Sequence, residues 1–213
     1  MRTFDMKTSP RQEHFNFFRR FDFPHFNICA NVRIPEFYAY IKEHDISFNI
    51  SVVYILARTA NAIPEFRYRI REEKVVEHEV VHPSPTIMGK EDVFGFVGLE
   101  YKDSFSDFAA GATEKIKRVK ENPRVIEVDQ GRDDWLFMTA IPWVSFTSFM
   151  HPLKIPVDSV PRFAWGKFFE DGDTLKMPLS VQGHHALMDG LHMGRYFELA
   201  QEYFWQPEIV LGG

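Results

Sequence analysis

Apolar and polar residues alternate in several stretches of the chain, and this alternation predicts strands. The clearest stretch is residues 26–34, FNICANVRI, in which every second residue from Phe26 to Ile34 is apolar. A period of two is typical of a strand with one buried face. Residues 162–185 form two such runs on either side of the turn sequence Asp171-Gly172-Asp173, so we expect a hairpin there.

Further strands follow from the same pattern. Residues 65–81 favour a second hairpin, with Phe66, Tyr68 and Ile70 alternating against arginines. Shorter apolar runs predict strands at 86–88, 93–101 and 135–143.

Apolar residues at helical spacing predict helices in the intervening stretches. The first helix begins near Ser9, which can form a capping box with Gln12, and ends near Arg20. The others are expected at 35–44, 49–62, 104–123 and 189–205. Helices and strands therefore interleave without regular βαβ order, which predicts an α/β or α+β fold with a large mixed sheet. No repeat or linker interrupts the pattern, so residues 1–213 are expected to form a single domain.

Composition and charge narrow the class of protein. The 213 residues are 45% apolar and 26% charged, which is typical of a globular chain. A formal net charge of −5 offers no basic surface for nucleic acid. The sequence shows no apolar leader and no apolar run of membrane length, and Cys29 is its single cysteine. We therefore expect a cytoplasmic protein with a free thiol and no membrane partner.

The stretch SVQGHHALMDGLHMGRYF, residues 180–197, carries the candidate chemistry. Two adjacent histidines end a predicted strand, and neighbours on a strand point to opposite faces. His184 and His185 therefore have different roles: one packs, while the other can face a cleft and accept a proton near neutral pH. Histidines near an apolar face are more often hydrogen-bonded core residues than catalytic bases, and spacing alone does not separate the two.

The same stretch contains a candidate set of metal ligands. Four such residues lie within nine positions: His184, His185, Asp189 and His192. Adjacent histidines diverge on a strand and no second cluster completes the set, so we expect no metal site. Asp189 precedes the last predicted helix and can cap it. Two further histidines, His78 and His82, are expected to be exposed to solvent.

Four segments in order resemble the chloramphenicol acetyltransferase family. Residues 180–197 match the family signature of two histidines, three residues, aspartate and glycine after a strand. RQEHFNFFRR is similar to the family's N-terminal helix, MTAIPWVSFTSF to its central buried strand and the segment after it, and EDGDTLKMPLSVQ to the hairpin before the histidines. The likeness covers nearly the whole chain.

The resemblance implies a two-layer sandwich whose large mixed sheet is extended across the interfaces of a homotrimer. It also implies acetyl-CoA as co-substrate, no permanently bound cofactor, and a small hydroxyl-bearing acceptor such as chloramphenicol, as in antibiotic resistance. In the family pattern His185 is the general base for direct transfer to the acceptor. Thr139 stands where the family has a serine that donates to the oxyanion, and Asp189 matches an aspartate that forms a buried ion pair with the residue equivalent to Arg11.

The likeness also assigns residues to the acceptor and cofactor sides of the site. Phe18, Phe26 and Ala164 are expected in the acceptor pocket. Phe18 stands where resistance enzymes carry a tyrosine and Ala164 replaces a threonine, so chloramphenicol is expected to be a poorer acceptor.

On the cofactor side, Lys167 and Phe168 match the family's lysine and aromatic residue, whereas Ser47 replaces a lysine near the cofactor phosphate.

Two alternative functions remain. One is a trimer of the same fold that binds an apolar ligand without transfer, which the departures from the family favour. The other is the acyltransferase core of a 2-oxo-acid dehydrogenase complex, whose lipoyl and linker segments have no counterpart in these residues.

Overall fold

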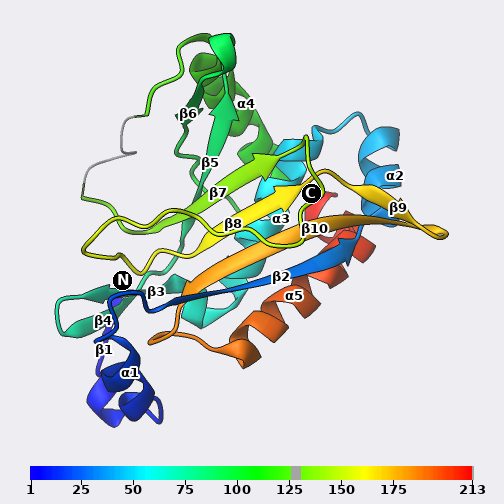
Figure 1. The fold of residues 1–213 in the computed structure, drawn as a ribbon. Coiled ribbons are helices and arrows are strands. Elements are labelled where there is room, and N and C mark those ends of the chain that lie inside the picture. The colour runs from blue at the N-terminus through cyan, green and yellow to red at the C-terminus, as the bar shows by residue number, and fades with distance from the viewer. Residues whose placement is uncertain (126–130, 213) are drawn as a thin grey trace.

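The computed structural model describes residues 1–125 and 131–212, and its centre is a seven-stranded mixed sheet (Figure 1). The strand order is β2-β10-β8-β7-β5-β6, with β9 beside β10. β5, β7 and β8 are parallel to one another, and the remaining pairs are antiparallel. The strands are β2 (His25–Arg33), β5 (His82–Met88), β6 (Phe94–Phe96), β7 (Trp135–Ile141), β8 (Arg162–Gly166), β9 (Phe169–Asp171) and β10 (Thr174–His184).

Helices cover one face of this sheet. They are α2 (Pro35–Glu43), α3 (Phe48–Ala62), α4 (Phe105–Glu121), α5 (Gly190–Trp205) and the short α6 (Glu208–Leu211). Figure 1 shows α3 and α5 behind the strands, where α3 is apolar on nearly all sides, as is typical of a buried helix. Tyr196 of α5 donates to the carbonyl of Leu56 in α3 at 2.9 Å, so the two helices are joined inside the core. None of the helices in the described ranges has the length and apolarity that crossing a membrane requires.

The opposite face of the sheet is polar. Leu179 and Val181 of β10 point into the helix-side core, so Ser180 and Gln182 between them point to the other face. Both polar residues are 1% exposed, because the segment 142–161 between β7 and β8 folds back over them. Ser180 Oγ donates to the Phe149 carbonyl at 3.0 Å, which fixes this segment on β10.

A second, smaller sheet has the order β1-β4-β3 and packs near the N-terminal helix. Its strands are β1 (Arg2–Phe4), β3 (Tyr68–Arg71) and β4 (Lys74–Glu77), and α1 spans Gln12–Phe18. Short 3-10 turns lie at η1 (Met6–Thr8), η2 (Pro64–Arg67) and η3 (Lys90–Asp92).

The β3–β4 hairpin has two packed faces, and the sequence pattern identified only one of them. Tyr68 and Ile70 pack with Val75 in an apolar cluster as expected, but Arg69 on the opposite face is buried as well. Arg69 is 1% exposed and donates to the carbonyls of Asp133, Phe66, Tyr68 and Trp135 at 2.6 to 3.0 Å. Tyr68 and Ile70 are only partly buried. The four carbonyls compensate the charged guanidinium. Two of them, those of Asp133 and Trp135, lie in a distant segment that a local pattern cannot bring to Arg69.

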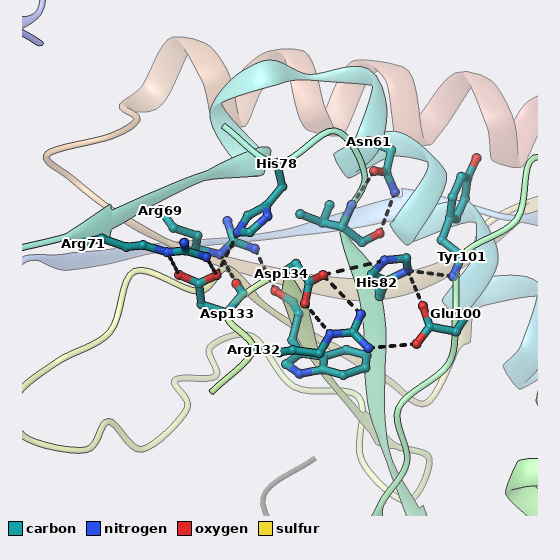
Figure 2. A network of polar contacts seen from close by, with 12 residues as sticks. Asn61, Arg69, Arg71, His78, His82, Glu100, Tyr101, Arg132, Asp133 and Asp134 are labelled. Atoms are coloured by element: carbon teal, nitrogen blue, oxygen red, sulfur yellow. Dashed lines mark hydrogen bonds and ion pairs between the residues drawn. The ribbon is translucent and has the colours of Figure 1, made fainter. Parts of the chain in front are cut away.

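The prediction that His78 and His82 are exposed is also wrong, because both belong to a polar network at this edge (Figure 2). His78 Nε2 lies 2.8 Å from Asp133 Oδ1, and Arg71 pairs with the same carboxylate. His82 Nδ1 accepts from the Tyr101 amide at 3.0 Å, and burial lowers the pKa of its ring despite the nearby acidic groups. The acidic partners are Asp133 of His78 and both Asp134 and Glu100 of His82, and all three lie well away from their histidine in sequence.

Most of the longer predicted elements are confirmed to within about two residues: β2, α2, α3, α4, β7, the β8–β10 hairpin and α5. The strand expected at 93–101 is reduced to Phe94–Phe96, whereas the one expected at 86–88 begins at His82. The N-terminal capping box is wrong, since α1 begins at Gln12 with Arg11 as N-cap and ends at Phe18. Ser9 Oγ instead accepts from the Arg11 amide at 3.2 Å. β1 and α6 were not predicted from the sequence.

Candidate active site

The two motif histidines stand where β10 ends and turns into the loop before α5. Gly183 permits this turn to pass close to the core, because a Cβ there would lie 2.3 Å from Met188 Sδ. His184 is 4% exposed and packs its ring edge-on against His25, with centroids 5.1 Å apart. Burial, reinforced by His25, lowers the pKa of His184 to about 3, so its ring is neutral near pH 7. His184 is thus the packing member of the pair.

His185 has the other orientation and lies between two aromatic rings. Phe18 of α1 stacks on its imidazole with centroids 3.9 Å apart and planes 6° from parallel, and Phe26 of β2 covers it at 4.6 Å. The backbone N–H of His185 donates to the Pro24 carbonyl at 2.8 Å. Its Nδ1 is buried and has no hydrogen-bond partner within the described residues. The ring edge that carries Nε2 is therefore the part left for another molecule.

Asp189 holds the far end of the histidine loop. It is the N-cap of α5, and its Oδ1 accepts from the Leu191 amide at 3.0 Å, as expected from its position. Its Oδ2 accepts from Arg11 Nη1, so α1 and the loop are joined by an ion pair. Burial opposes ionisation of the carboxyl, but Arg11 and His192 outweigh it and hold the pKa of Asp189 at about 2. The pair expected to be buried is only partly so, with side chains 22% and 32% exposed.

His192 is a supporting residue that the sequence did not single out beyond the rejected metal set. It is 6% exposed and occupies the third position of α5, where its Nδ1 accepts from the Asp189 amide at 3.1 Å. Its Nε2 lies 3.3 Å from Glu65 Oε1 in η2. The signal that could have identified it is its spacing from Asp189, which is that of a capping box.

Thr139 and Ala164 lie on neighbouring strands, away from His185. Thr139 of β7 pairs with Ala164 of β8, and Ala164 pairs with Ser180 of β10, so this row lies on the polar face of the sheet. Ala164 is completely buried and does not join Phe18 and Phe26, which flank His185 on the other face. The structure therefore divides the predicted acceptor pocket of one chain into two separate regions.

The residues expected on the cofactor side lie at another end of the sheet. Phe168 packs between Tyr38 and Phe48, with centroids 5.3 and 5.6 Å away, and these rings line a pocket of about 290 Å³ with Lys42 and Asp45. The neighbouring Lys167 is exposed, and its amide donates to the Val144 carbonyl at 2.9 Å.

Ser47 borders this region as the N-cap of α3. Its Oγ accepts from the Ile50 amide at 3.5 Å, so the hydroxyl has a structural partner.

Solved structures share the fold of this chain. A chloramphenicol acetyltransferase superposes with a TM-score of 0.89 at 26% identity, covering 95% of this chain and 99% of that chain. A dihydrolipoamide acetyltransferase from Azotobacter vinelandii has a TM-score of 0.68 at 15% identity, covering 93% and 88%, and shows the fold alone. Together with the histidine loop at the end of β10, this fold places the protein among the acyltransferases.

Sequence comparison narrows this class to one family. The description "Chloramphenicol acetyltransferase" applies to the family that matches residues 1–201. A chloramphenicol acetyltransferase of Escherichia coli is 32% identical over 209 residues, covering 96% of this chain and 94% of its own length. One from Bacillus pumilus is 28% identical over 192 residues, covering 88% and 86%. The chain belongs to the chloramphenicol acetyltransferase family.

Proposed function

We propose that the protein transfers the acetyl group of acetyl-CoA to a hydroxyl of chloramphenicol or a related acceptor, with His185 as general base. The observation that carries this proposal is the placement of the His185 ring between Phe18 and Phe26, with its Nε2 edge left open. Aromatic walls suit an acceptor that itself carries an aromatic ring. The names of the relatives supply the acetyl group and the acceptor class, and the family likeness implies acetyl-CoA as the donor.

The reaction proceeds by direct attack. Nε2 of His185 takes the proton of the acceptor hydroxyl while the hydroxyl oxygen bonds to the thioester carbonyl carbon. The tetrahedral oxyanion accepts a hydrogen bond from the Thr139 hydroxyl. Cleavage of the C–S bond then releases CoA thiolate, which takes the proton back from the imidazolium and leaves the base as it began.

Such a site needs two copies of the chain. His184 lies four residues beyond Ser180, about 13 Å along β10, and Thr139 lies two strands to the side, about 10 Å away. His185 and Thr139 also face opposite sides of the sheet, so one chain cannot direct both at a single carbonyl. In a homotrimer, His185 of one copy meets Thr139 of the next at each of three interfaces. Exposed apolar side chains such as Phe17 and Trp143, 61% and 64% exposed, suit such interfaces.

Release of free CoA thiol from acetyl-CoA and chloramphenicol tests the chemistry. His185→Ala is expected to lower kcat by about 10²–10⁴-fold. His44→Ala, at an exposed histidine that directly follows α2, is the matched control and is expected to keep full activity. Equal rates for the two variants would remove His185 from the reaction. Ligand binding without thiol release over a panel of alcohols would favour a binding protein, and transfer to dihydrolipoamide alone would favour the dehydrogenase-core function.

Complementation tests the shared site. Two variants expected to have low activity, His185→Ala and Thr139→Val, are coexpressed so that mixed trimers form. Random mixing restores an intact pair in about one quarter of the sites if the two residues come from different copies. No regain of activity in purified mixed trimers would place the whole site within one chain.

A further inference from the structure

His151 lies in the segment 142–161, which crosses the polar face of the sheet. Its backbone N–H donates to Gln182 Oε1 at 3.0 Å, and the nearby Phe149 carbonyl accepts from Ser180 Oγ. Gln182 and Ser180 are each 1% exposed on β10, so His151 is attached to a rigid part of the fold. Its ring is oriented by the edge-to-face contact with Phe149, at 4.8 Å and 81°.

The ring of His151 reaches the hydroxyl of Thr139. Its Nε2 lies 3.3 Å from Thr139 Oγ1, across two segments that are 12 residues apart in sequence. Burial, with a smaller contribution from Arg162, lowers the pKa of His151 to about 4, so its imidazole is neutral near pH 7. A neutral imidazole has one N–H donor and one acceptor nitrogen, and which atom faces the hydroxyl decides what the hydroxyl can do.

A threonine hydroxyl has a single proton to donate. If Nε2 were the acceptor, that proton would be directed at His151 and lost to an oxyanion. If Nε2 carries the hydrogen, it donates to Oγ1, and the hydroxyl proton is free to point at the reacting carbonyl. A donor behind the hydroxyl also polarises it and strengthens the bond that it donates.

We propose that His151 is a positioning residue for Thr139: its Nε2–H donates to Oγ1 and directs the hydroxyl proton toward the oxyanion. The inference rests on the proposed function of Thr139. The 3.3 Å contact is long for a hydrogen bond and adds little to folding, so the effect of His151 is expected in kcat.

A double-mutant cycle in the whole enzyme tests the inference. His151→Leu is expected to lower kcat about tenfold and to leave both KM values nearly unchanged, because a misdirected oxyanion donor loses part of its contribution. His151→Gln, whose amide nitrogen can occupy the place of Nε2, is the conservative variant and is expected to retain most of kcat. In a Thr139→Val background, His151→Leu is expected to have less than about a twofold further effect, since the residue through which it acts is gone.

The outcomes separate this inference from the proposed function. An equal loss in both backgrounds, or no loss in either, overturns the positioning role while Thr139 keeps its own. Full activity of Thr139→Val overturns the oxyanion role and the inference with it, but leaves His185 untouched.

A measurement on the unaltered protein covers the case in which a variant fails to fold. NMR of histidine labelled with ¹⁵N is expected to show His151 as the Nε2–H tautomer at pH 7, and the Nδ1–H tautomer would overturn the inference.

Discussion

Replacing Asp189 by asparagine separates its two structural roles. Asparagine keeps a side-chain oxygen to accept from the Leu191 amide, so α5 stays capped, but it removes the charge that pairs with Arg11. Arg11 Nε and Nη2 are buried without hydrogen-bond partners among the described residues, so the guanidinium depends on this carboxylate. The loss is therefore expected to exceed that of an ordinary surface pair.

The size of the effect follows from the electrostatics. The pKa of Asp189 is lowered from 3.8 to about 2, and one pKa unit corresponds to about 1.4 kcal/mol, which sets an upper value near 2.5 kcal/mol. Since the side chains are 22% and 32% exposed, solvent screening reduces the expected coupling to about 1–2 kcal/mol. Replacement of Asp189 by alanine is expected to cost about 1 kcal/mol more, because the cap is lost as well.

Urea unfolding at one fixed protein concentration measures these values through tryptophan fluorescence. Asp189→Asn, Arg11→Gln and the double variant form a cycle whose coupling energy isolates the pair. A coupling below about 0.3 kcal/mol would refute the reasoning, since additive sites agree within that margin. In the same variants kcat is expected to fall at least about tenfold, because displacement of the loop would misalign His185, the proposed base. A destabilised variant with unchanged kcat would confine the pair to folding.

Three further predictions concern supporting residues. The free energy of unfolding is expected to fall by about 2–4 kcal/mol per pH unit from about pH 6.5 toward pH 4. His25, His151 and His184 have folded pKa values of about 4, 4 and 3, so in this range the unfolded chain binds more protons than the folded one. His184→Gln should reduce that slope by about a third, and a urea midpoint that does not change between pH 7 and pH 5 would contradict the prediction. Ser47→Ala is expected to lose about 1 kcal/mol of helix capping, or about 2–4 °C in Tm, with no change in KM for acetyl-CoA; a raised KM would place Ser47 at the cofactor instead. His192→Leu is expected to lower Tm by a similar amount and to lower kcat, whereas His192→Gln, which can still accept from the Asp189 amide, should retain both; equal Tm values for the two variants would exclude the capping role.

Local sequence signals were sufficient for the long elements. The alternation in residues 26–34 predicts a strand with one buried face, and the apolar run of α3 predicts a helix buried on all sides. Both predictions succeed because the burial of these elements is reflected in residues that are close together in sequence. β1 was missed since three residues carry no periodicity, and its pairing depends on β4, more than 70 positions later. The burial of Arg69 was missed because its carbonyl partners in residues 133–135 meet it only in the folded chain.

In the candidate site, too, some residues carry a local sequence signal and others depend on contacts between distant segments. The histidine motif identifies His185 and Asp189, and the ion pair with Arg11 was expected from the family likeness. His151 carries no local signal, because it lies in a segment without helix or strand and reaches Thr139 only after that segment folds over β10. The separation of Thr139 from His185 on opposite faces also depends on strand register, which residue patterns do not specify between distant strands.

His185 and the Phe18 ring that stacks on it are supported by very different parts of the fold. His185 follows the eleven-residue strand β10, which is paired with β2 from Lys176 to His184. Phe18 is the last residue of the seven-residue helix α1, whose N-cap Arg11 is held by the ion pair with Asp189. Changes in α1 can therefore reshape the pocket without disturbing the imidazole. Substitutions confined to this peripheral helix are therefore the ones expected to alter what fits beside His185 at little cost to the main sheet.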